Sequence, residues 1–89
     1  MAVNYEKVSE TLKALAHPAR LKMVVGLLKD ECNVTQIQKV LGLPQSTISQ
    51  HLRILKNAGI IKGRREGTKT CYRVIDAQVR KIVEIIKRK

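Results

Sequence analysis

The sequence predicts one mainly α-helical domain that carries a single β-hairpin, and three observations support this prediction. Apolar residues recur at helical spacing through most of residues 5–58. Gly42 and Pro44 interrupt that spacing, so one short helix ends, the chain turns tightly, and a second helix follows. Two strand-forming runs then flank Glu66-Gly67, and a last helix follows them. The order α-α-α-α-β-β-α is that of a winged helix-turn-helix.

The first two helices are expected over residues 5–16 and 18–29. Pro18 suits the first turn of the second helix, where its missing N–H is no loss. The first helix has apolar residues three or four positions apart, at Tyr5, Val8, Leu12 and Leu15. The second has its apolar side at Leu21, Val24, Val25 and Leu28.

The third helix is short and is expected over residues 36–41. Residues 30–34 are expected to separate it from the second helix as an irregular segment, with one short strand as an alternative. Thr35 is the expected N-cap, because Gln38 three residues later completes a capping-box pattern.

The fourth helix is expected over residues 45–58. Gly59 is a natural stop just after it. Pro44 stands where Ser or Thr is the usual cap, and this departure costs some local stability. The side chains expected to face inward are Ile48, Leu52 and Leu55.

The hairpin is expected from strands 60–65 and 68–75, because Glu66-Gly67 lets the chain reverse tightly. Asp76 then caps the last helix, which should reach residue 88. The apolar stripe of that helix consists of Val79, Ile82, Val83 and Ile86.

The terminal helices, 5–16 and 76–88, carry apolar stripes at opposite ends of the chain, which forms a single domain over residues 1–89. In so small a domain one stripe can be left without cover from the rest of the chain. A two-fold symmetric homodimer would bury it. We therefore expect a homodimer in which such a stripe is buried.

The charge of the chain is unevenly distributed. The net charge is +11, yet residues 1–50 contribute only +2 and residues 51–89 contribute +9. The positive field therefore lies over the fourth helix, the hairpin and the tail, as expected of a surface that binds a polyanion. A solvated, solubilising face is the alternative. Tyr5 and Tyr72 are the only aromatic residues, which argues against base stacking as the mode of binding.

The fourth helix has the features of a recognition helix. Short hydrogen-bonding side chains crowd its first two turns, as base edges and phosphates in a major groove require, and basic side chains continue its exposed face. The candidates for DNA contact are Gln45, Ser46, Thr47, Ser49, Gln50, His51, Arg53 and Lys56. A merely solvated polar face is the alternative. For His51, packing or a phosphate contact is expected rather than metal ligation.

The hairpin is the predicted wing. Its basic side chains flank Gly67 and are Lys62, Arg64, Arg65 and Lys69. Beside a recognition helix, such a ribbon should follow the DNA backbone or reach into the minor groove; surface charge alone is the alternative. Arg20 could contact a phosphate or form a salt bridge. Two recognition helices about one duplex turn (~34 Å) apart would read a palindromic operator in double-stranded DNA.

The two cysteines are too few for a disulfide scaffold. Strand alternation groups Cys71 with Lys69 and Arg73, and nearby positive charge favours the thiolate, so Cys71 is a possible redox residue. An inert strand residue is the alternative. Cys32 is expected to be buried beside Val34 and structural.

Several classes of protein do not fit. No apolar run approaches the ~20 residues of a membrane span, and no signal peptide is recognisable, so we expect a cytoplasmic protein. No metal or cofactor is expected, because the candidate ligands are spread over four elements: Cys32, Cys71, His17 and His51. We expect no enzyme, since nucleophile–base spacing, paired carboxylates and a Gly-rich phosphate loop are missing.

The chain resembles the ArsR/SmtB family of bacterial and archaeal dimeric winged-helix repressors. Residues 12–28, 34–61 and 64–74 carry the resemblance, and the run STISQHLRILKNAG is its most specific part. The resemblance implies a dimer interface built from the first and last helices. It also implies repression that is relieved when an inducer binds.

The known sensor motifs of that family do not carry over. The two thiolate positions of its third-helix metal motif align with Asn33 and Thr35, and Cys32 is displaced. At the start of the last helix Asp76 lacks the histidine that the metal-binding members have there. The redox-sensing members join their second and last helices through a cysteine pair, and neither helix contains cysteine here.

We therefore predict a homodimeric, sequence-specific DNA-binding transcriptional regulator, of the repressor type released by an inducer. The alternative is a non-specific architectural nucleic-acid-binding protein of the same fold. A protein–protein module in which the wing is only surface is a third hypothesis.

Overall fold

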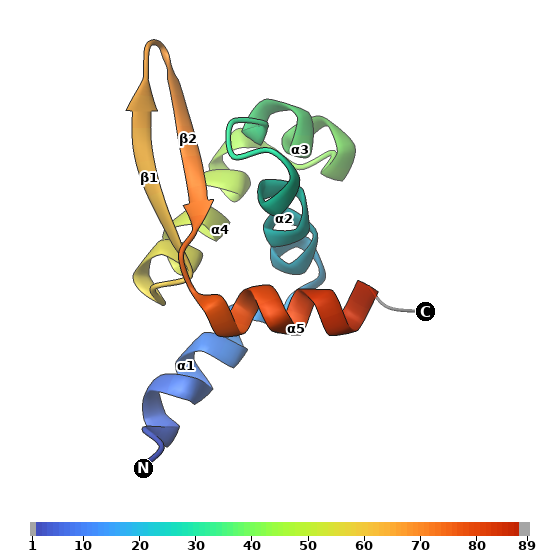
Figure 1. Ribbon diagram of the computed structural model, residues 1–89. Helices are drawn as coiled ribbons and strands as arrows, with labels where there is room; N and C mark the ends of the chain where they lie inside the picture. The colour runs from blue at the N-terminus through green and yellow to red at the C-terminus, as the bar shows by residue number, and fades with distance from the viewer. Residues whose placement is uncertain (1, 88–89) are drawn as a thin grey trace.

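The computed structural model describes residues 2–87, and within them it contains five helices and one antiparallel hairpin in the predicted order (Figure 1). The elements are α1 (Tyr5–Leu15), α2 (Pro18–Lys29), α3 (Val34–Leu41), α4 (Gln45–Asn57), β1 (Ile61–Glu66), β2 (Lys69–Val74) and α5 (Ala77–Lys87). The predicted winged helix-turn-helix is confirmed. Within the described part, no helix has the length and apolarity needed to cross a membrane.

The two ends of the molecule differ in character. Figure 1 shows α3 and the hairpin tip at one end and α1 and α5 at the other, with α2 between them. The core lies where α2, α4, the base of the hairpin and α5 meet, because burial of their aliphatic side chains is the main stabilising contribution available to so small a chain. Its best-buried members include Met23, Val24, Leu27, Leu55, Ile60, Val74 and Val79. The wing and the helix-turn-helix are thus built on one rigid base.

Helix α1 buries a different face from the one that spacing alone suggests. Thr11, Ala14 and Leu15 are buried, whereas Tyr5 is 76% exposed and Leu12 is 49% exposed. Within the predicted apolar stripe, Tyr5 and Leu12 are therefore largely exposed, whereas Val8 is partly buried and Leu15 is buried.

The predicted start of α3 was wrong. The helix begins at Val34, with Asn33 at the N-cap position and no side-chain capping bond, so Thr35 and Gln38 form no capping box. The Asn33 amide is used elsewhere, since its Nδ2 donates to the Gly26 carbonyl of α2 at 3.3 Å. Residues 30–33 form a turn rather than the alternative short strand.

The turn signals around α4 are confirmed. Gly42 adopts φ +66°, a left-handed conformation that glycine reaches without the steric strain of other residues. Pro44 occupies the N-cap position of α4 and makes no side-chain capping bond. After α4, Gly59 adopts φ +76°. The Ile60 N–H then bonds the Leu55 carbonyl at 3.0 Å, which completes a Schellman stop.

The hairpin and α5 lie close to their predicted positions. The strands pair with Arg64 opposite Cys71, and the two-residue tip is Gly67-Thr68, one position later than predicted. Asp76 caps α5 as predicted, because its Oδ1 accepts from the Gln78 and Val79 N–H groups at 2.9 and 3.2 Å.

Candidate nucleic-acid interface

Helix α4 presents a polar face to solvent because its apolar side chains hold the opposite face in the core. Ile48, Leu52 and Leu55 are buried. The exposed predicted contact residues are Gln45, Ser46, Ser49, Gln50, Arg53 and Lys56, and Thr47 is half-buried. Most of the side chains singled out from the sequence therefore share one accessible face with amide, hydroxyl and cationic groups.

His51 does not belong to that face. It is only 9% exposed, its ring lies 4.7 Å from the His17 ring, and its Nδ1 lies 3.3 Å from Arg20 Nη1. Arg20 also donates from Nε to the Ala14 carbonyl at 2.6 Å. Arg20 and His51 thus join the ends of α1 and α2 to α4. We leave His51 out of the proposed DNA contacts.

The environment of His51 lowers its pKa from the ordinary value of 6.5, first through burial and then through the nearby His17 and Arg20. Above this ordinary value the imidazole is neutral in both folded and unfolded chains, and the stability is complete. As the pH falls through the window below 6.5, the unfolded chain takes up the proton first, so the free energy of unfolding decreases.

We expect urea unfolding to show this loss between about pH 7.5 and pH 5.5. His51→Gln keeps an acceptor for Arg20 but does not titrate, so its loss should be smaller. Equal losses in the two proteins would contradict the assignment.

The wing carries the predicted cations, but they are not equivalent. Lys62, Arg65 and Lys69 are exposed. Arg64 is also exposed, yet its guanidinium bonds the carboxylates of Glu31 and Glu66 at 2.5 and 2.9 Å. The hydrogen bonds to Glu66 and Glu31 raise the pKa of Arg64 above its usual range. The charge of Arg64 is therefore partly neutralised by two carboxylates of its own chain.

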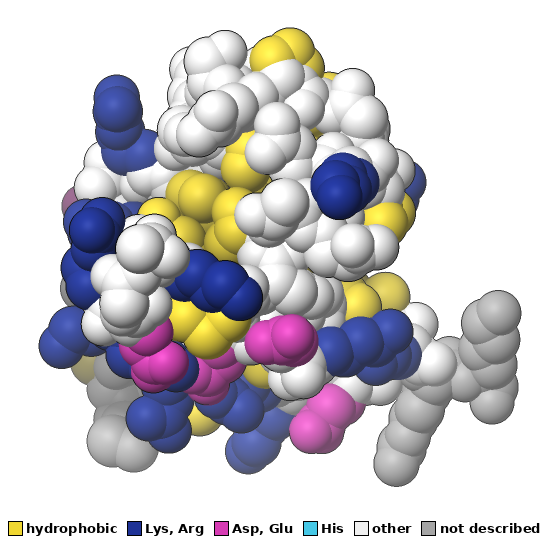
Figure 2. Space-filling view, turned by 90° about the horizontal axis from the view of Figure 1, so that it is seen from above, with side chains coloured by type: hydrophobic (Ala, Val, Ile, Leu, Met, Phe, Trp, Pro, Cys, Tyr) yellow, Lys and Arg dark blue, Asp and Glu magenta, His cyan; other side chains and the backbone are white. Residues whose placement is uncertain are grey.

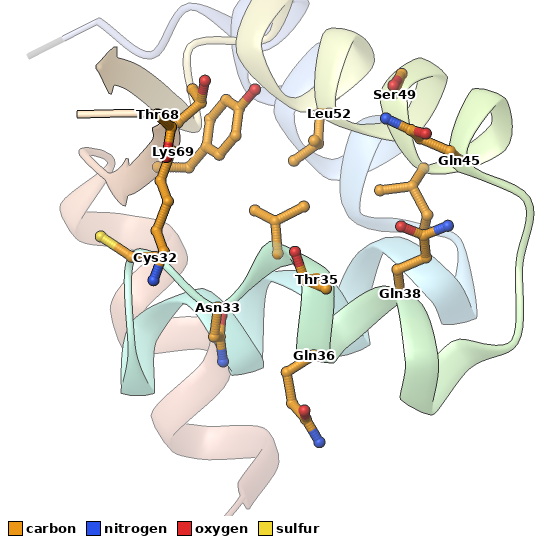
Figure 3. A pocket seen from close by; sticks show the side chains of 14 residues that line it. Cys32, Asn33, Thr35, Gln36, Gln38, Gln45, Ser49, Leu52, Thr68 and Lys69 are labelled. Carbon is orange, nitrogen blue, oxygen red and sulfur yellow. The ribbon is translucent and has the colours of Figure 1, made fainter. Parts of the chain in front are cut away.

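A groove of about 530 Å³ separates the wing from the helix-turn-helix. Figure 3 shows Thr68 and Lys69 on the wing side, Gln45, Ser49 and Leu52 on α4, and Thr35 and Gln38 on α3. Figure 2, which looks onto this end of the molecule, shows apolar side chains in the hollow and Lys and Arg side chains around it. The groove thus has an apolar floor and a polar, cationic rim.

Four further residues line this groove that the sequence did not single out as site residues: Thr35, Gln38, Thr68 and Thr70. Their spacing carries no signal, because they come from α3 and from the wing tip and meet only in the fold. Glu31, the partner of Arg64, was missed for the same reason.

The pairing of the two cysteines was not predicted. Cys32 and Cys71 are disulfide-bonded, with their Cα atoms 4.2 Å apart. Cys71 is fully buried, whereas Lys69 and Arg73, with which strand alternation groups it, are exposed. Cys32, Cys71, His17 and His51 come from different segments, as expected, but they form two contacting pairs, since His17 also lies against His51.

Comparison with known proteins identifies the family. Residues 17–62 match the sequence profile described as "Bacterial regulatory protein, arsR family". The chain belongs to the ArsR family. It is 44% identical over 84 residues to an uncharacterized HTH-type transcriptional regulator of Methanocaldococcus jannaschii, covering 92% of this chain and 93% of that protein. It is also 40% identical to the transcriptional repressor PagR of Bacillus anthracis, covering 94% and 85%.

Solved structures of relatives share the fold of this ArsR-family chain. The crystal structure of PagR matches with a TM-score of 0.81 over 93% of this chain and 95% of that one. A homodimeric winged helix-turn-helix DNA-binding domain from Mycobacterium bovis, 31% identical, matches with the same TM-score over 93% and 77%. The predicted family is confirmed. The chain is a sequence-specific DNA-binding transcriptional regulator, and its family has a regulatory rather than an enzymatic role.

Proposed function

We propose that the protein is a homodimeric repressor that binds a palindromic operator, with α4 in the major groove and the wing beside it. The observation that carries this proposal is the groove itself, because the polar face of α4 and the cationic hairpin border the same opening (Figure 3). One wall offers side chains that can bond base edges, and the other offers charges that can pair with phosphates. Several relatives, PagR among them, are named as transcriptional repressors. These names support repression as the function of this protein. Such a repressor acts where the DNA is, in the cytoplasm.

The proposed contacts fall into two sets. Base contacts are assigned to the start of α4, because the side chains there carry amide or hydroxyl groups that can hydrogen-bond base edges. These residues are Gln45, Ser46, Thr47, Ser49 and Gln50. Phosphate contacts are assigned to Arg53, Lys56, Lys62, Arg65 and Lys69. Arg64 joins the second set only to the extent that DNA competes with its two carboxylate partners.

The proposed dimer interface lies on α1 and α5. Besides Tyr5 and Leu12, the exposed apolar side chains there include Ile85 (69%) and Ile86 (58%). Both helices lie at the end of the molecule opposite the wing tip (Figure 1). Pairing through them buries apolar surface and leaves both wings and both α4 helices free for DNA. The homodimeric relative from Mycobacterium bovis supports a homodimer.

The decisive experiment is footprinting of the full chain on the DNA directly upstream of its own gene. We expect a protected palindrome whose affinity exceeds that for random duplex by ~10³ or more. Equal affinity for random duplex would favour the architectural alternative. No salt-dependent binding to any duplex would favour a protein–protein module.

Arg65→Ala should weaken binding to the operator and to random duplex alike, and should reduce the slope of log affinity against log salt by about 1. The reason is that a phosphate contact carries no sequence information. Binding measured over a salt series tests this. Lys22→Ala, which removes an exposed cation of α2 outside the groove, is the matched control and should leave the slope unchanged.

Gln45→Ala and Ser46→Ala should instead change which sequences are preferred. Losing a bidentate contact with a base removes about 1–3 kcal/mol of discrimination at one position of the site. Selection of bound sequences from a randomised operator library measures this. If these variants lose affinity uniformly, as Arg65→Ala should, the assignment of α4 as the base-reading helix is wrong.

A further inference from the structure

The disulfide connects two parts of the molecule that the proposed function requires to act together. Cys32 lies in the turn between α2 and α3, immediately before the helix-turn-helix. Cys71 lies in β2, in the wing, 39 residues later. The bond therefore ties the wing to the helix-turn-helix at the edge of the groove, which Cys32 helps to line (Figure 3).

We propose that Cys32 and Cys71 form a reversible thiol–disulfide switch, and that its oxidised form binds the operator more tightly because the wing is held in place. The proposal rests on the proposed function, since it assigns a regulation to the same groove. This switch differs from that of the redox-sensing members of the family, whose cysteine pair joins the second and last helices. Here Cys71 lies in the wing and Cys32 in the turn before α3.

Non-covalent contacts keep the two cysteines side by side whether or not they are bonded. The Tyr72 N–H, next to Cys71, donates to the Glu31 carbonyl, next to Cys32, at 2.7 Å. Arg64, which is opposite Cys71 in the hairpin register, bonds the Glu31 carboxylate at 2.5 Å. These contacts span the same junction as the disulfide. Reduction should therefore leave the thiols within reach of each other, as a reversible switch requires.

The two sulfurs differ in access, which assigns their roles. Cys32 is partly exposed, whereas Cys71 is fully buried. The Lys69 side chain extends toward Cys32 (Figure 3). Lys69 and Cys32 line the same groove, and positive charge near a cysteine is a condition of thiolate reactivity. The Glu66 carboxylate also lies within 4.8 Å of both sulfurs, but Arg64 pairs with it at 2.9 Å and offsets its charge. Cys32 is thus the group that meets an oxidant, and Cys71 is the resolving thiol.

A peroxide is the oxidant class that fits this arrangement. The Cys32 thiolate attacks the O–O bond of hydrogen peroxide, which yields a Cys32 sulfenic acid and, after protonation, one water. The Cys71 sulfur then attacks the Cys32 sulfur, the S–S bond forms, and the sulfenic oxygen leaves as a second water. In total two thiols lose two electrons and two protons, and one peroxide becomes two waters. A dithiol reductant reverses the change by thiol–disulfide exchange.

The effect on DNA binding follows from the position of the tie. Without the bond, the contacts of Glu31 with Tyr72 and Arg64 still hold the junction. The tip of the wing beyond it is a two-stranded ribbon, which is marginally stable by itself, so part of its order must be gained when it meets DNA. The disulfide holds Lys69 and Thr68 as one wall of the groove against α3 and α4 before DNA arrives (Figure 3). Ordering the site in advance lowers the cost of binding. In this tied form the cations of the wing and the polar face of α4 already border one opening.

Metal ligation by the same cluster is less well supported. Cys32, Cys71 and Glu66 offer three ligand atoms within 4.8 Å of one another, whereas zinc takes about four. A cation would also displace Arg64 from Glu66, since that guanidinium already holds the carboxylate.

The test compares the full chain after hydrogen peroxide with the full chain after a dithiol reductant. Alkylation and mass spectrometry report the thiols, hydrogen exchange reports the order of the hairpin, and titration of the footprinted operator reports affinity. We expect an intramolecular disulfide that forms and is reduced reversibly, slower exchange in the oxidised hairpin, and an operator Kd lower by roughly three- to tenfold in the oxidised form. Cys32→Ser/Cys71→Ser should bind like the reduced protein under both conditions. Cys32→Ser alone should do so too, which separates the pair from a lone Cys71.

Two free thiols after peroxide, or one operator Kd for both redox forms, would overturn the switch. So would protection of both thiols from alkylation by one equivalent of zinc, because the pair would then be a metal site. Loss of operator preference in both forms would count against the proposed function instead. In that case hydrogen exchange decides, and equal exchange of the hairpin in the two forms overturns the switch.

Discussion

Leu12→Glu is expected to convert the protein to a monomer and to weaken operator binding by roughly 10²- to 10⁴-fold. Leu12 is half exposed in the middle of α1, in the proposed interface with the apolar residues of α5. A carboxylate there would have to lose its hydration without a partner when two chains pair. Each half-site would then bind separately, and the gain from linking two recognition helices would be lost.

Sedimentation and operator titration measure the two effects. Ile86→Glu on α5 should behave in the same way. Val40→Glu is the matched control, because Val40 is 74% exposed but belongs to α3, outside the proposed interface. A Leu12→Glu protein that remains dimeric would show that the chains pair through another surface. Circular dichroism should show that all three variants stay folded, since none of these side chains is in the core.

Reduction of the disulfide should lower the free energy of unfolding by about 4 kcal/mol, the chain-entropy estimate for a loop of this size. The bond joins residues that are 39 positions apart, and it removes conformations from the unfolded chain more than it adds contacts to the folded one. Several kcal/mol is a large part of the stability of a domain of 89 residues.

Urea unfolding with and without reductant measures this loss, at one fixed protein concentration because dimerisation also contributes to stability. Cys32→Ala/Cys71→Ala should match the reduced protein and should not respond to reductant. It avoids placing a hydroxyl at the buried position 71. An unfolding midpoint that is unchanged by reductant would mean that the bond does not form in solution.

Sequence analysis succeeded where the physical cause is local. Gly42 and Gly59 adopt left-handed conformations and Asp76 caps α5, and each signal acts within a few residues of its own position. The periodicity of α4 likewise predicted its buried residues Ile48, Leu52 and Leu55, since helical spacing alone places them on one face. It also predicted which polar residues of α4 face solvent, with His51 as the exception.

Several of the failures concern side chains whose partners lie on another element of the fold. The Asn33 amide donates to the Gly26 carbonyl of α2. Helix α3 then begins at Val34, so Thr35 is inside the helix and cannot be its N-cap. His51 turns inward because Arg20, 31 residues earlier, meets it there. A polar side chain at such a position can hydrogen-bond either with water or with a buried partner, and local spacing does not distinguish the two.

By itself the sequence determined the order of the elements, the family, the basic second half and the polar start of α4, because each depends on composition or on spacing of a few residues. Only the tertiary structure decided that Cys32 meets Cys71, that Glu31 holds Arg64, and that the wing and α4 enclose one groove. The first two pairings join positions more than thirty residues apart. They exist because the packed core brings the α2–α3 turn against β2, and no short-range pattern encodes that approach.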